Sequence, residues 1–462
     1  MREAQVLTGL SMPKSADTLR VGAGASFADD RFQPAVDLAE KGELDYLVFE
    51  CLAERTVARE NLTRLKNPDL GYTPRLSERM AQVLPPVVRN RVRVVTNMGA
   101  ANPPAAAREV RRVAQDLGLG DFSCAIVTGD DVSDLLRQHP GLPLMESGEP
   151  LETLLPKMAS ANAYLGADII VKALETNAQM VITGRVADPS LFLAPAMHRY
   201  GWTYENIERI GAGTVMGHLL ECCAQVSGGC FGDPGKKEVE NLAGLGFPYV
   251  DILEDGEMTI SKLDDAGGRV DLATCKEQLL YEMHDPAHYI TPDCVLDITG
   301  LHLTQSGKNH VTFRGARAKP HTDTYKVTVG YDDGYIGIGE ISYAGINAVA
   351  KAKWAADIVQ QRLKDTGHTY SEVRVDLIGM SSLHGRPDVR PEPYEVRLRL
   401  AMRCDNPKAA AAVGFEVRAL HVNGPCGGGG GSDPVVRKIL AVQSVLIPRK
   451  LVDPQVQVER IG

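Results

Sequence analysis

The chain of 462 residues has no excess of basic residues: 50 Lys and Arg stand against 59 Asp and Glu, which gives a formal net charge of −9. A protein that binds nucleic acid needs a concentration of positive charge to neutralise phosphates. The basic clusters are short, such as Arg108, Arg111 and Arg112, whose spacing suits one solvent-facing side of a helix. The sequence therefore argues against a nucleic-acid partner.

Long apolar runs are also missing. None reaches the roughly 18 to 20 residues that span a bilayer. Residues 1–20 lack a continuous apolar stretch followed by a small-residue cleavage site, so we expect no signal peptide. The nine cysteines are scattered and none forms a CxxC pair, which suggests neither a zinc site nor a disulfide framework. We expect a soluble, cytoplasmic protein with reduced thiols and no membrane partner.

The signatures of nucleotide sites and of activated serines are absent as well. No Gly-Lys-Ser/Thr follows a glycine-rich segment, as a P-loop would require. VGAGAS resembles the dinucleotide fingerprint loosely, but Phe27 stands where its third glycine belongs. There is no GxSxG nucleophile elbow. We therefore predict no cofactor and no metal ligands, with a bound metal ion kept as an alternative.

The first half of the chain alternates strand-like and helix-like segments. Residues with helical spacing follow the strand-like runs 19–24 and 92–104. The segment ASANAYLGADIIVKALET is rich in helix formers, and residues 204–230 are predicted to form one long helix. Such alternation predicts an α/β domain with a parallel sheet and helices on both faces. The strand-like runs are 19–24, 45–53, 92–104, 122–132 and 179–190.

Beyond residue 240 the predicted helices and strands follow a mixed α+β pattern. Several segments alternate with period two, Asp333-Gly334 is typical of a hairpin turn, and two helices are expected near 345–364 and 406–420. At roughly 150 residues per domain, the chain is long enough to form two or three domains. We predict an α/β domain over 1–240 and an α+β domain over 241–462.

Each of the five predicted strands ends in polar residues or glycine. In a parallel sheet, ligands bind at the carboxyl ends of the strands. Carboxylates that face each other in a partly dry cleft shift their pKa values and can act as acid and base. An arginine can hold an anionic substrate. We predict catalytic roles for Glu50, Asn97, Asp130 and Asp188, with Glu54 a further candidate, and substrate-binding roles for Gly24, Ser26, Arg31 and Arg185. Caps and salt bridges in ordinary polar loops would explain the same residues.

The segment GHLLECCAQ places His218 and Glu221 at i and i+3 on one helix face, among apolar neighbours. A buried pair of this kind is a candidate for general acid/base catalysis. A structural pair fits equally well, and His-x-x-Glu alone is a weak metal signal. We count both residues as catalytic candidates.

Two glycine-rich segments are predicted to lead into helices. GAGTVMG (211–217) opens or interrupts the helix of His218. GPCGGGGGS (424–432) ends in Ser432, a candidate N-cap, with Pro434 in the following first turn. Exposed amides at a helix start attract anions, so we predict that Gly427, Gly428 and Gly429 bind substrate. A flexible loop or an interdomain joint is the alternative.

The stretch YEMHDPAHYITPD concentrates His284, Asp285, His288 and Asp293 in a few residues. Asp-Pro and Thr-Pro-Asp favour turns and helix starts, which explains much of this density. The alternative interpretation is a metal site or a segment that reaches a neighbouring site, closing over the strand ends of the first domain.

Eight segments in order resemble the acyclic terpene utilisation family: VGAGASFADDRFQPAVDLAEKGELDYLVFECLAERT, RVVTNMGAANP, VTGDDV, ANAYLGAD, VITGRVADPSL, GTVMGHLLECCAQVSGG, LLYEMHDPAHYITPD and NGPCGGGGG. The resemblance runs from about residue 20 to the C-terminus. It implies catabolism of acyclic, branched or carboxylated compounds, often as CoA thioesters, but supplies no catalytic residues. Longer relatives carry an extra small C-terminal domain, which we expect this chain to lack.

Together these features predict a catabolic enzyme for a small anionic substrate, an acyclic branched carboxylic acid or its CoA thioester. Paired carboxylates suit a hydratase or another lyase step. One alternative is a hydrolase that uses a carboxylate- or metal-activated water. Another is a non-catalytic scaffold of a degradation pathway. A homo-oligomer is expected because most soluble oligomers are assembled from identical chains.

Overall fold

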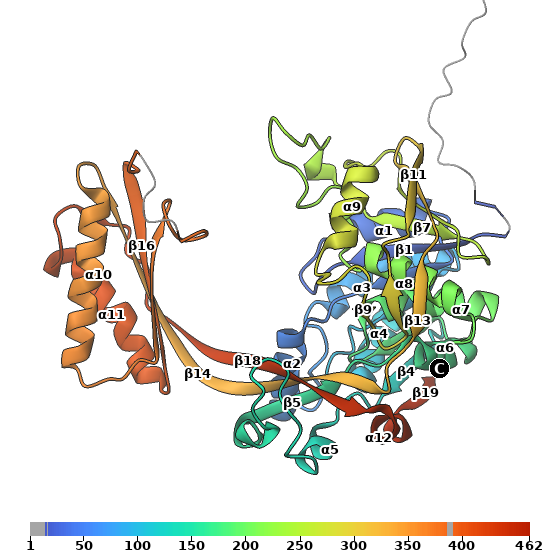
Figure 1. Cartoon of the computed structure of the whole chain (residues 1–462), viewed down its shortest axis with the longest axis horizontal. Coiled ribbons are helices and arrows are strands. Elements are labelled where there is room, and N and C mark those ends of the chain that lie inside the picture. The colour runs from blue at the N-terminus through green and yellow to red at the C-terminus, as the bar shows by residue number, and fades with distance from the viewer. Residues whose placement is uncertain (1–13, 16, 386–390) are drawn as a thin grey trace, which may run out of the picture. The chain divides into compact units, whose positions relative to one another are not determined.

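The computed structural model describes residues 14–15, 17–385 and 391–462, and the chain divides into two compact units (Figure 1). Unit 1 comprises the residues through Gly330 together with Val442–Gly462, and unit 2 comprises Tyr331–Ala441. The boundary predicted near residue 240 falls inside unit 1. The expectation about a signal peptide concerns residues 1–20, of which 1–13 and 16 lie outside the described residues.

The central sheet of unit 1 contains five adjacent parallel strands, in the order β1-β2-β3-β6-β4. All five were predicted, because a strand buried on both faces reads as a short continuous apolar run. The mixed α/β class with parallel strands is thus confirmed. The strands are β1 (Leu19–Ala25), β2 (Tyr46–Phe49), β3 (Arg93–Thr96), β4 (Cys124–Thr128) and β6 (Met180–Thr183).

Five antiparallel strands extend this sheet to ten. β7 pairs with β1 at one side, and β19, from the C-terminal end of the chain, pairs with β4 at the other. Strands from both sides of residue 240 therefore share one sheet. The added strands are β7 (Pro248–Ile252), β8 (Met258–Lys262), β11 (His302–Gly307), β12 (His310–Arg314) and β19 (Gln457–Ile461).

Helices connect the strands of unit 1. The helices expected after the first and third strands are present, and the helix over 204–230 is shorter than predicted, because α8 ends at Leu220. The helices longer than one turn are α1 (Gln33–Lys41), α2 (Glu54–Lys66), α3 (Leu76–Arg89), α4 (Pro103–Asp116), α5 (Ser133–Arg137), α6 (Ala167–Glu175), α7 (Asp188–Tyr200), α8 (Ile207–Leu220) and α9 (Leu272–Leu280). Within the described ranges, no helix combines the length and apolar character needed to cross a bilayer.

The prediction of helix for the start of ASANAYLGADIIVKALET was wrong. Residues Met158–Ala163 form a strand, β5, which pairs with β14, and the helix α6 begins only at Ala167. The alanines suggested a helix, but they alternate with Ser160 and Asn162 at period two, and that periodicity is typical of a strand.

The glycines of GAGTVMG lie inside α8 and serve packing. A Cβ atom at Gly217 would lie 2.4 Å from the Pro189 carbonyl oxygen, so only glycine lets α8 approach α7 this closely. The segment does not form a loop at a helix start.

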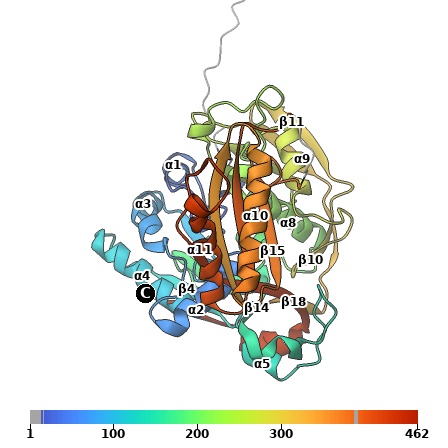
Figure 2. The same ribbon diagram turned by 90° about the vertical axis from the view of Figure 1, so that its left-hand side faces the viewer.

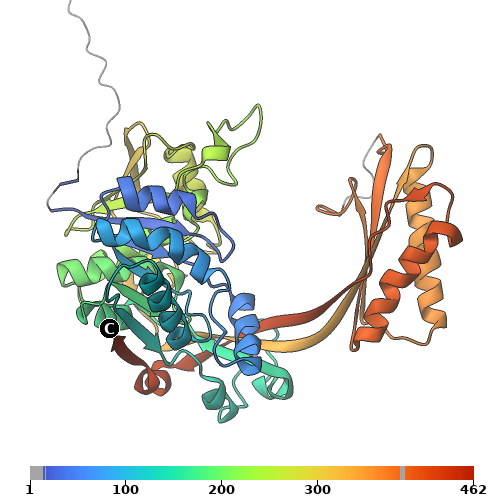
Figure 3. The same cartoon turned by 180° about the vertical axis from the view of Figure 1, so that it is seen from behind.

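The described part of unit 2 contains an antiparallel sheet in the order β15-β16-β14-β17 and two helices. Both helices were predicted, and Figure 2 shows them side by side. Their Ala and Val side chains pack on Leu398 and Leu400 of β16. The elements are α10 (Ala348–Asp365), α11 (Pro407–Asn423), β14 (Thr324–Ala344), β15 (Glu372–Ile378), β16 (Glu395–Cys404), β17 (Gly428–Gly429) and β18 (Val435–Pro448). β14 and β18 pair with each other and run from one unit into the other (Figures 1 and 3).

Two predictions in this part of the chain, a hairpin turn and a helix start, were wrong. Asp333-Gly334 forms no hairpin, because β14 continues through it. A Cβ at Gly334 would lie 2.6 Å from the Cys404 carbonyl oxygen, so this glycine permits a close approach of strands. Ser432 caps no helix: β18 follows it, and the Ser432 hydroxyl accepts a hydrogen bond from the Glu340 backbone N–H. The helix start that would have attracted an anion is therefore absent.

Candidate active site

A pocket of about 390 Å³ opens in unit 1 beside the carboxyl end of β6. Its size is ordinary for a small-molecule site. It has a charged and hydroxyl-bearing side and an apolar side. The titratable lining residues are Glu54, Tyr164, Arg185, Asp188, Glu282, Tyr289, Tyr325 and Lys326, and the larger apolar ones are Met145, Pro189, Ile290, Pro292 and Leu446.

Arg185 is the buried centre of the charged side. It follows β6 directly, its Nη1 donates to the Leu52 carbonyl, and its Nη2 lies 3.2 Å from Asp188 Oδ1. The guanidinium stacks on the ring of Tyr164 with its Cζ 4.0 Å from the ring centroid. Burial lowers the pKa of Arg185, but the charges of Asp188 and Glu54 outweigh it, so the pKa is raised and the group stays protonated. Arg185 thus provides a fixed positive charge.

Asp188 begins α7 and exposes 31 % of its side chain. Burial raises the pKa of this carboxyl well above its ordinary value. The negative charges of Glu50 and Glu221 add to the rise, and Arg185 opposes it. The balance favours the protonated form of Asp188 more than for an ordinary aspartate, so this pocket residue is suited to donate a proton.

Glu54, at the start of α2, has the opposite electrostatic balance. The Tyr164 hydroxyl donates to its carboxylate, and Lys326 Nζ lies 4.0 Å from Oε1. Burial would raise the pKa of Glu54, but Arg185, Tyr164 and Lys326 together lower it. The side chain is 40 % exposed. Glu54 and Asp188 are therefore two carboxyl groups of one pocket whose pKa values are shifted in opposite directions.

Glu50 and Asn97 are buried and are not among the residues that line the pocket. Glu50 Oε1 accepts hydrogen bonds from the Leu52 backbone N–H at 2.8 Å and from Asn97 Nδ2 at 3.1 Å. Burial raises the pKa of Glu50 to about 7, against the lowering effect of Leu52, Arg185 and Asn97. Glu50 acts on Asp188 through its charge, and Asn97 supports Glu50 by donating a hydrogen bond to it.

Asp130 holds the turn that carries Arg185. Its Oδ2 accepts from the Arg185 backbone N–H at 2.9 Å and from Asn162 Nδ2 at 2.8 Å. Burial raises the pKa of Asp130 to about 6, which these hydrogen bonds oppose. Asp130 contacts the backbone of a pocket residue but does not line the pocket.

His218 and Glu221 form a buried pair at the end of α8, as their spacing predicted. His218 Nδ1 lies 2.8 Å from Glu221 Oε1, and Nε2 lies 3.2 Å from the Leu279 carbonyl oxygen. Burial lowers the pKa of His218, but Glu221 and Leu279 outweigh burial and raise it. The imidazole ring lies 5.2 Å from that of Tyr289 and is not itself in the pocket wall.

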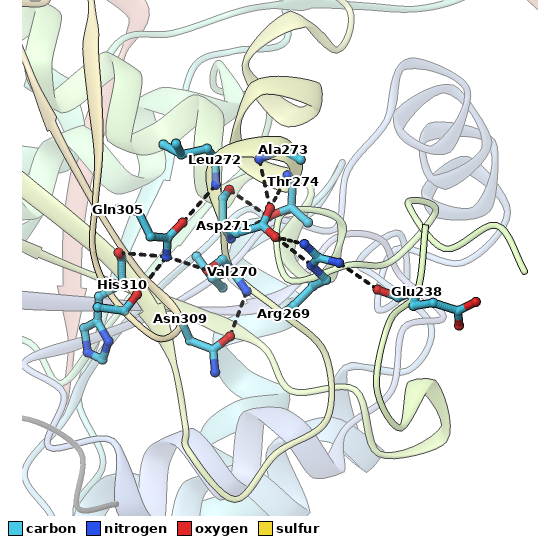
Figure 4. Close-up of polar contacts among 11 residues, drawn as sticks. Glu238, Arg269, Val270, Asp271, Leu272, Ala273, Thr274, Gln305, Asn309 and His310 are labelled. Atoms are coloured by element: carbon cyan, nitrogen blue, oxygen red, sulfur yellow. Dashed lines mark hydrogen bonds and ion pairs between the residues drawn. The ribbon is translucent and has the colours of Figure 1, made fainter. Parts of the chain in front are cut away.

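The helix α9, which supplies the Leu279 carbonyl, is fixed at its start by a polar network (Figure 4). Asp271 caps it by accepting from the backbone N–H groups of Ala273 and Thr274, and Arg269 binds the Asp271 carboxylate. Gln305 accepts from the Leu272 backbone N–H at 3.2 Å. An N-terminal cap of this kind stabilises a helix by roughly 1 kcal/mol. The network therefore stabilises the helix whose other end supplies the Leu279 carbonyl to His218.

The predicted substrate-binding residues other than Arg185 lie outside this pocket. A Cβ at Gly24 would lie 2.5 Å from the Phe49 ring, so Gly24 serves packing. Ser26 donates to the Asp30 carboxylate within a turn. Arg31 lines a separate cavity of about 290 Å³. The three glycines of the predicted anion loop, Gly427, Gly428 and Gly429, belong to unit 2.

The stretch YEMHDPAHYITPD contributes to the pocket wall through Glu282 and residues 289–292. Asp293 is buried and accepts from Ser190, Tyr204 and the Ala167 backbone, which is a structural role. Among the residues that the structure describes, no group of three or more His, Cys, Asp or Glu is placed to hold a metal ion.

Sequence reasoning missed Tyr164, Tyr289 and Lys326. Tyr164 directly follows β5, so recognition of the period-two pattern in ASANA would have placed it at a strand end. Tyr289 stands within a stretch that was singled out for its His and Asp residues alone. Lys326 lies in a strand of alternating pattern, and nothing in its local sequence marks it.

The model of the acyclic terpene utilisation family protein AtuA matches residues 19–458. A comparison with curated proteins found no match to the chain. The family match covers nearly all of the sequence and implies a role in acyclic terpene utilisation. The chain belongs to the acyclic terpene utilisation family.

Proposed function

We propose that the protein is an enzyme that adds water to, or removes it from, an acyclic branched carboxylic acid or its CoA thioester. One observation carries the proposal: two carboxylates in one pocket, Glu54 and Asp188, have pKa values shifted in opposite directions around the buried Arg185. Environments that separate the pKa values of two acids in this way define a base and an acid.

The dehydration direction uses both groups. Ionised Glu54 removes a proton from the carbon next to the substrate carbonyl, and protonated Asp188 gives its proton to the hydroxyl on the following carbon. A carbon–carbon double bond forms, the carbon–oxygen bond breaks and water leaves. The two carboxyls exchange protonation states and return to their starting states through solvent. The reverse sequence adds water.

The remaining lining residues suit a substrate with one polar end. Lys326 Nζ, beside Glu54, would neutralise a carboxylate or polarise a thioester carbonyl. Met145, Ile290 and Leu446 are exposed apolar residues from three separate segments, and all three line this pocket. Exposed apolar side chains that gather at one pocket are suited to a hydrocarbon chain. The substrate would place its polar end near Asp188 and its branched chain along these three residues.

The experiment is a substrate panel in D₂O. Branched 3-hydroxy acids and 2-enoic acids, as free acids and as CoA thioesters, are incubated with wild-type protein, Glu54→Gln and Asp188→Asn, and the products are followed by mass spectrometry. We expect interconversion with deuterium incorporation next to the carbonyl, and losses of about 100-fold or more in both variants. Arg31→Gln, in the separate cavity, is the control and should retain full activity.

Three results would contradict the proposal. One is no conversion and no exchange for any member of the panel. Another is full activity of both carboxylate variants. The third, release of free CoA without dehydration, would favour a hydrolase instead.

A further inference from the structure

The strand β15 forms an edge of the unit 2 sheet. It pairs along its length with β16, and among the described residues no strand pairs with its other side. Its seven residues, EVRVDLI, contain no proline, and its register with β16 has no bulge. Val375 at its centre is 39 % exposed, and Val373 and Ile378 are exposed as well. Proteins usually protect long edges with charged side chains, proline, bulges or very short strands, because an open edge pairs with another strand. Of these devices β15 has only charged side chains, which alternate with its apolar residues.

The sequence of β15 is complementary to itself. If a second β15 runs antiparallel with Val375 opposite Val375, then Val373 stands opposite Leu377 of the other copy. Arg374 stands opposite Asp376, so each side of the twofold axis has one pair of opposite charges. Side chains directly opposite each other on neighbouring strands are close enough to interact, and opposite charges stabilise such pairs.

The alternation of β15 supports this register. Val373, Val375 and Leu377 share the face of the sheet that carries α10 and α11, since they lie opposite Met402, Leu400 and Leu398 of β16. The charged residues share the other face, where Arg374 Nε lies 2.8 Å from Asp376 Oδ1. Self-pairing would therefore join two apolar faces and two charged faces without mixing them.

We propose that β15 is a dimerisation edge, which pairs antiparallel with β15 of a second copy about a twofold axis at Val375. The two sheets then form one continuous sheet, and the interface uses the same residues from both copies. Interfaces of this twofold kind are the commonest among homo-oligomers.

Cysteine cross-linking of the full chain tests the register. Val375→Cys places two thiols opposite each other at the axis, whereas Val373→Cys leaves its two copies roughly 14 Å apart along the strands. With mild oxidant we expect a covalent dimer from Val375→Cys and little from Val373→Cys. Equal cross-linking of the two variants, or none with Val375→Cys, would overturn the proposed register.

Charged substitutions of Ile378, at the end of β15, distinguish an effect on dimerisation from an effect on the folding of one chain. Ile378 would stand opposite Glu372 of the second copy, but within its own chain it lies opposite Arg397. Ile378→Lys should therefore tighten the dimer and Ile378→Glu should weaken it, while the effects inside one chain run the other way. By sedimentation we expect dissociation constants about threefold to tenfold apart. A monomer at all concentrations, or the reverse order, would overturn the proposal.

Discussion

Arg185 Nη2 lies 3.2 Å from Asp188 Oδ1, within the distance of an ion pair, yet the pKa of Asp188 lies well above its ordinary value. An isolated pair of this kind would lower the pKa of the carboxyl. Here burial and the charges of Glu50 and Glu221 outweigh the arginine. Arg185 is shared among several carboxylates, so it cannot hold all of them ionised.

Stability should depend on pH through Glu50. Its pKa is raised to about 7 in the folded protein, so its contribution is fully present below its unfolded pKa of about 4 and is lost as pH rises through 7. Glu50→Gln should therefore have a higher melting temperature than wild type at pH 8 and the same one at pH 4, as calorimetry would measure. The exposed Glu78→Gln serves as the control, and an equal effect at both pH values would contradict the assignment.

Loss of Arg185 should destabilise the fold in a pH-dependent way. Arg185→Met leaves buried carboxylates without their shared cation, which costs about 3 to 5 kcal/mol at pH 7.5. Part of that loss should be recovered near pH 5, where Glu50, whose pKa is raised to about 7, is protonated. Chemical denaturation at the two pH values measures the free energy of unfolding of wild type and Arg185→Met. Arg209→Met, at a side chain that is 39 % exposed and 4.0 Å from Glu254, should cost little, and a pH-independent loss for Arg185→Met would contradict the prediction.

Tyr164 should set the acid limb of the activity profile. Its hydroxyl donates to Glu54 and helps to lower the pKa of that carboxylate. Tyr164→Phe removes the hydrogen bond, so the pKa of Glu54 rises and the acid limb of kcat/KM moves to higher pH. Tyr325→Phe is a matched control, because Tyr325 also lines the pocket but donates to Asp453. An unchanged acid limb in Tyr164→Phe would contradict this role.

The exposed apolar residues of the pocket should set chain-length preference. Leu446→Asn removes apolar contact with the substrate chain, and we expect roughly tenfold weaker binding of a ten-carbon branched acid with little change for a four-carbon acid. Titration calorimetry measures both. Leu242→Asn changes an equally apolar exposed residue away from the pocket and should bind both acids like wild type. Equal loss for the two acids would count against the proposed orientation.

The parallel core of the sheet was predictable from the sequence, because strands buried on both faces appear as short apolar runs. The places of β7 and β19 in that sheet were not, since they join it through pairing between distant segments that leaves no local pattern. The strand ends led to Asp188 and Arg185. The sequence could not show that Glu50, Asn97 and Asp130 lie behind the residues that line the pocket, because burial depends on tertiary packing.

The prediction of a helix where β5 forms also hid one residue of the site. Alanine has a high helix propensity, and pairing with β14 overrode it. With that strand missed, Tyr164 was not placed at a strand end. Lys326 reaches the pocket from a strand 162 positions further along than Tyr164 by sequence number, a proximity that only the tertiary fold creates.

The central proposal rests on the separation of two pKa values, and carboxyl titration by NMR tests it without any substrate. Protein with ¹³C-labelled Asp and Glu side chains is titrated, and Glu54→Gln and Asp188→Asn assign the two signals. We expect Glu54 to titrate below an ordinary glutamate and Asp188 well above an ordinary aspartate. Ordinary pKa values for both groups, or the opposite order, would contradict the assignment of base and acid.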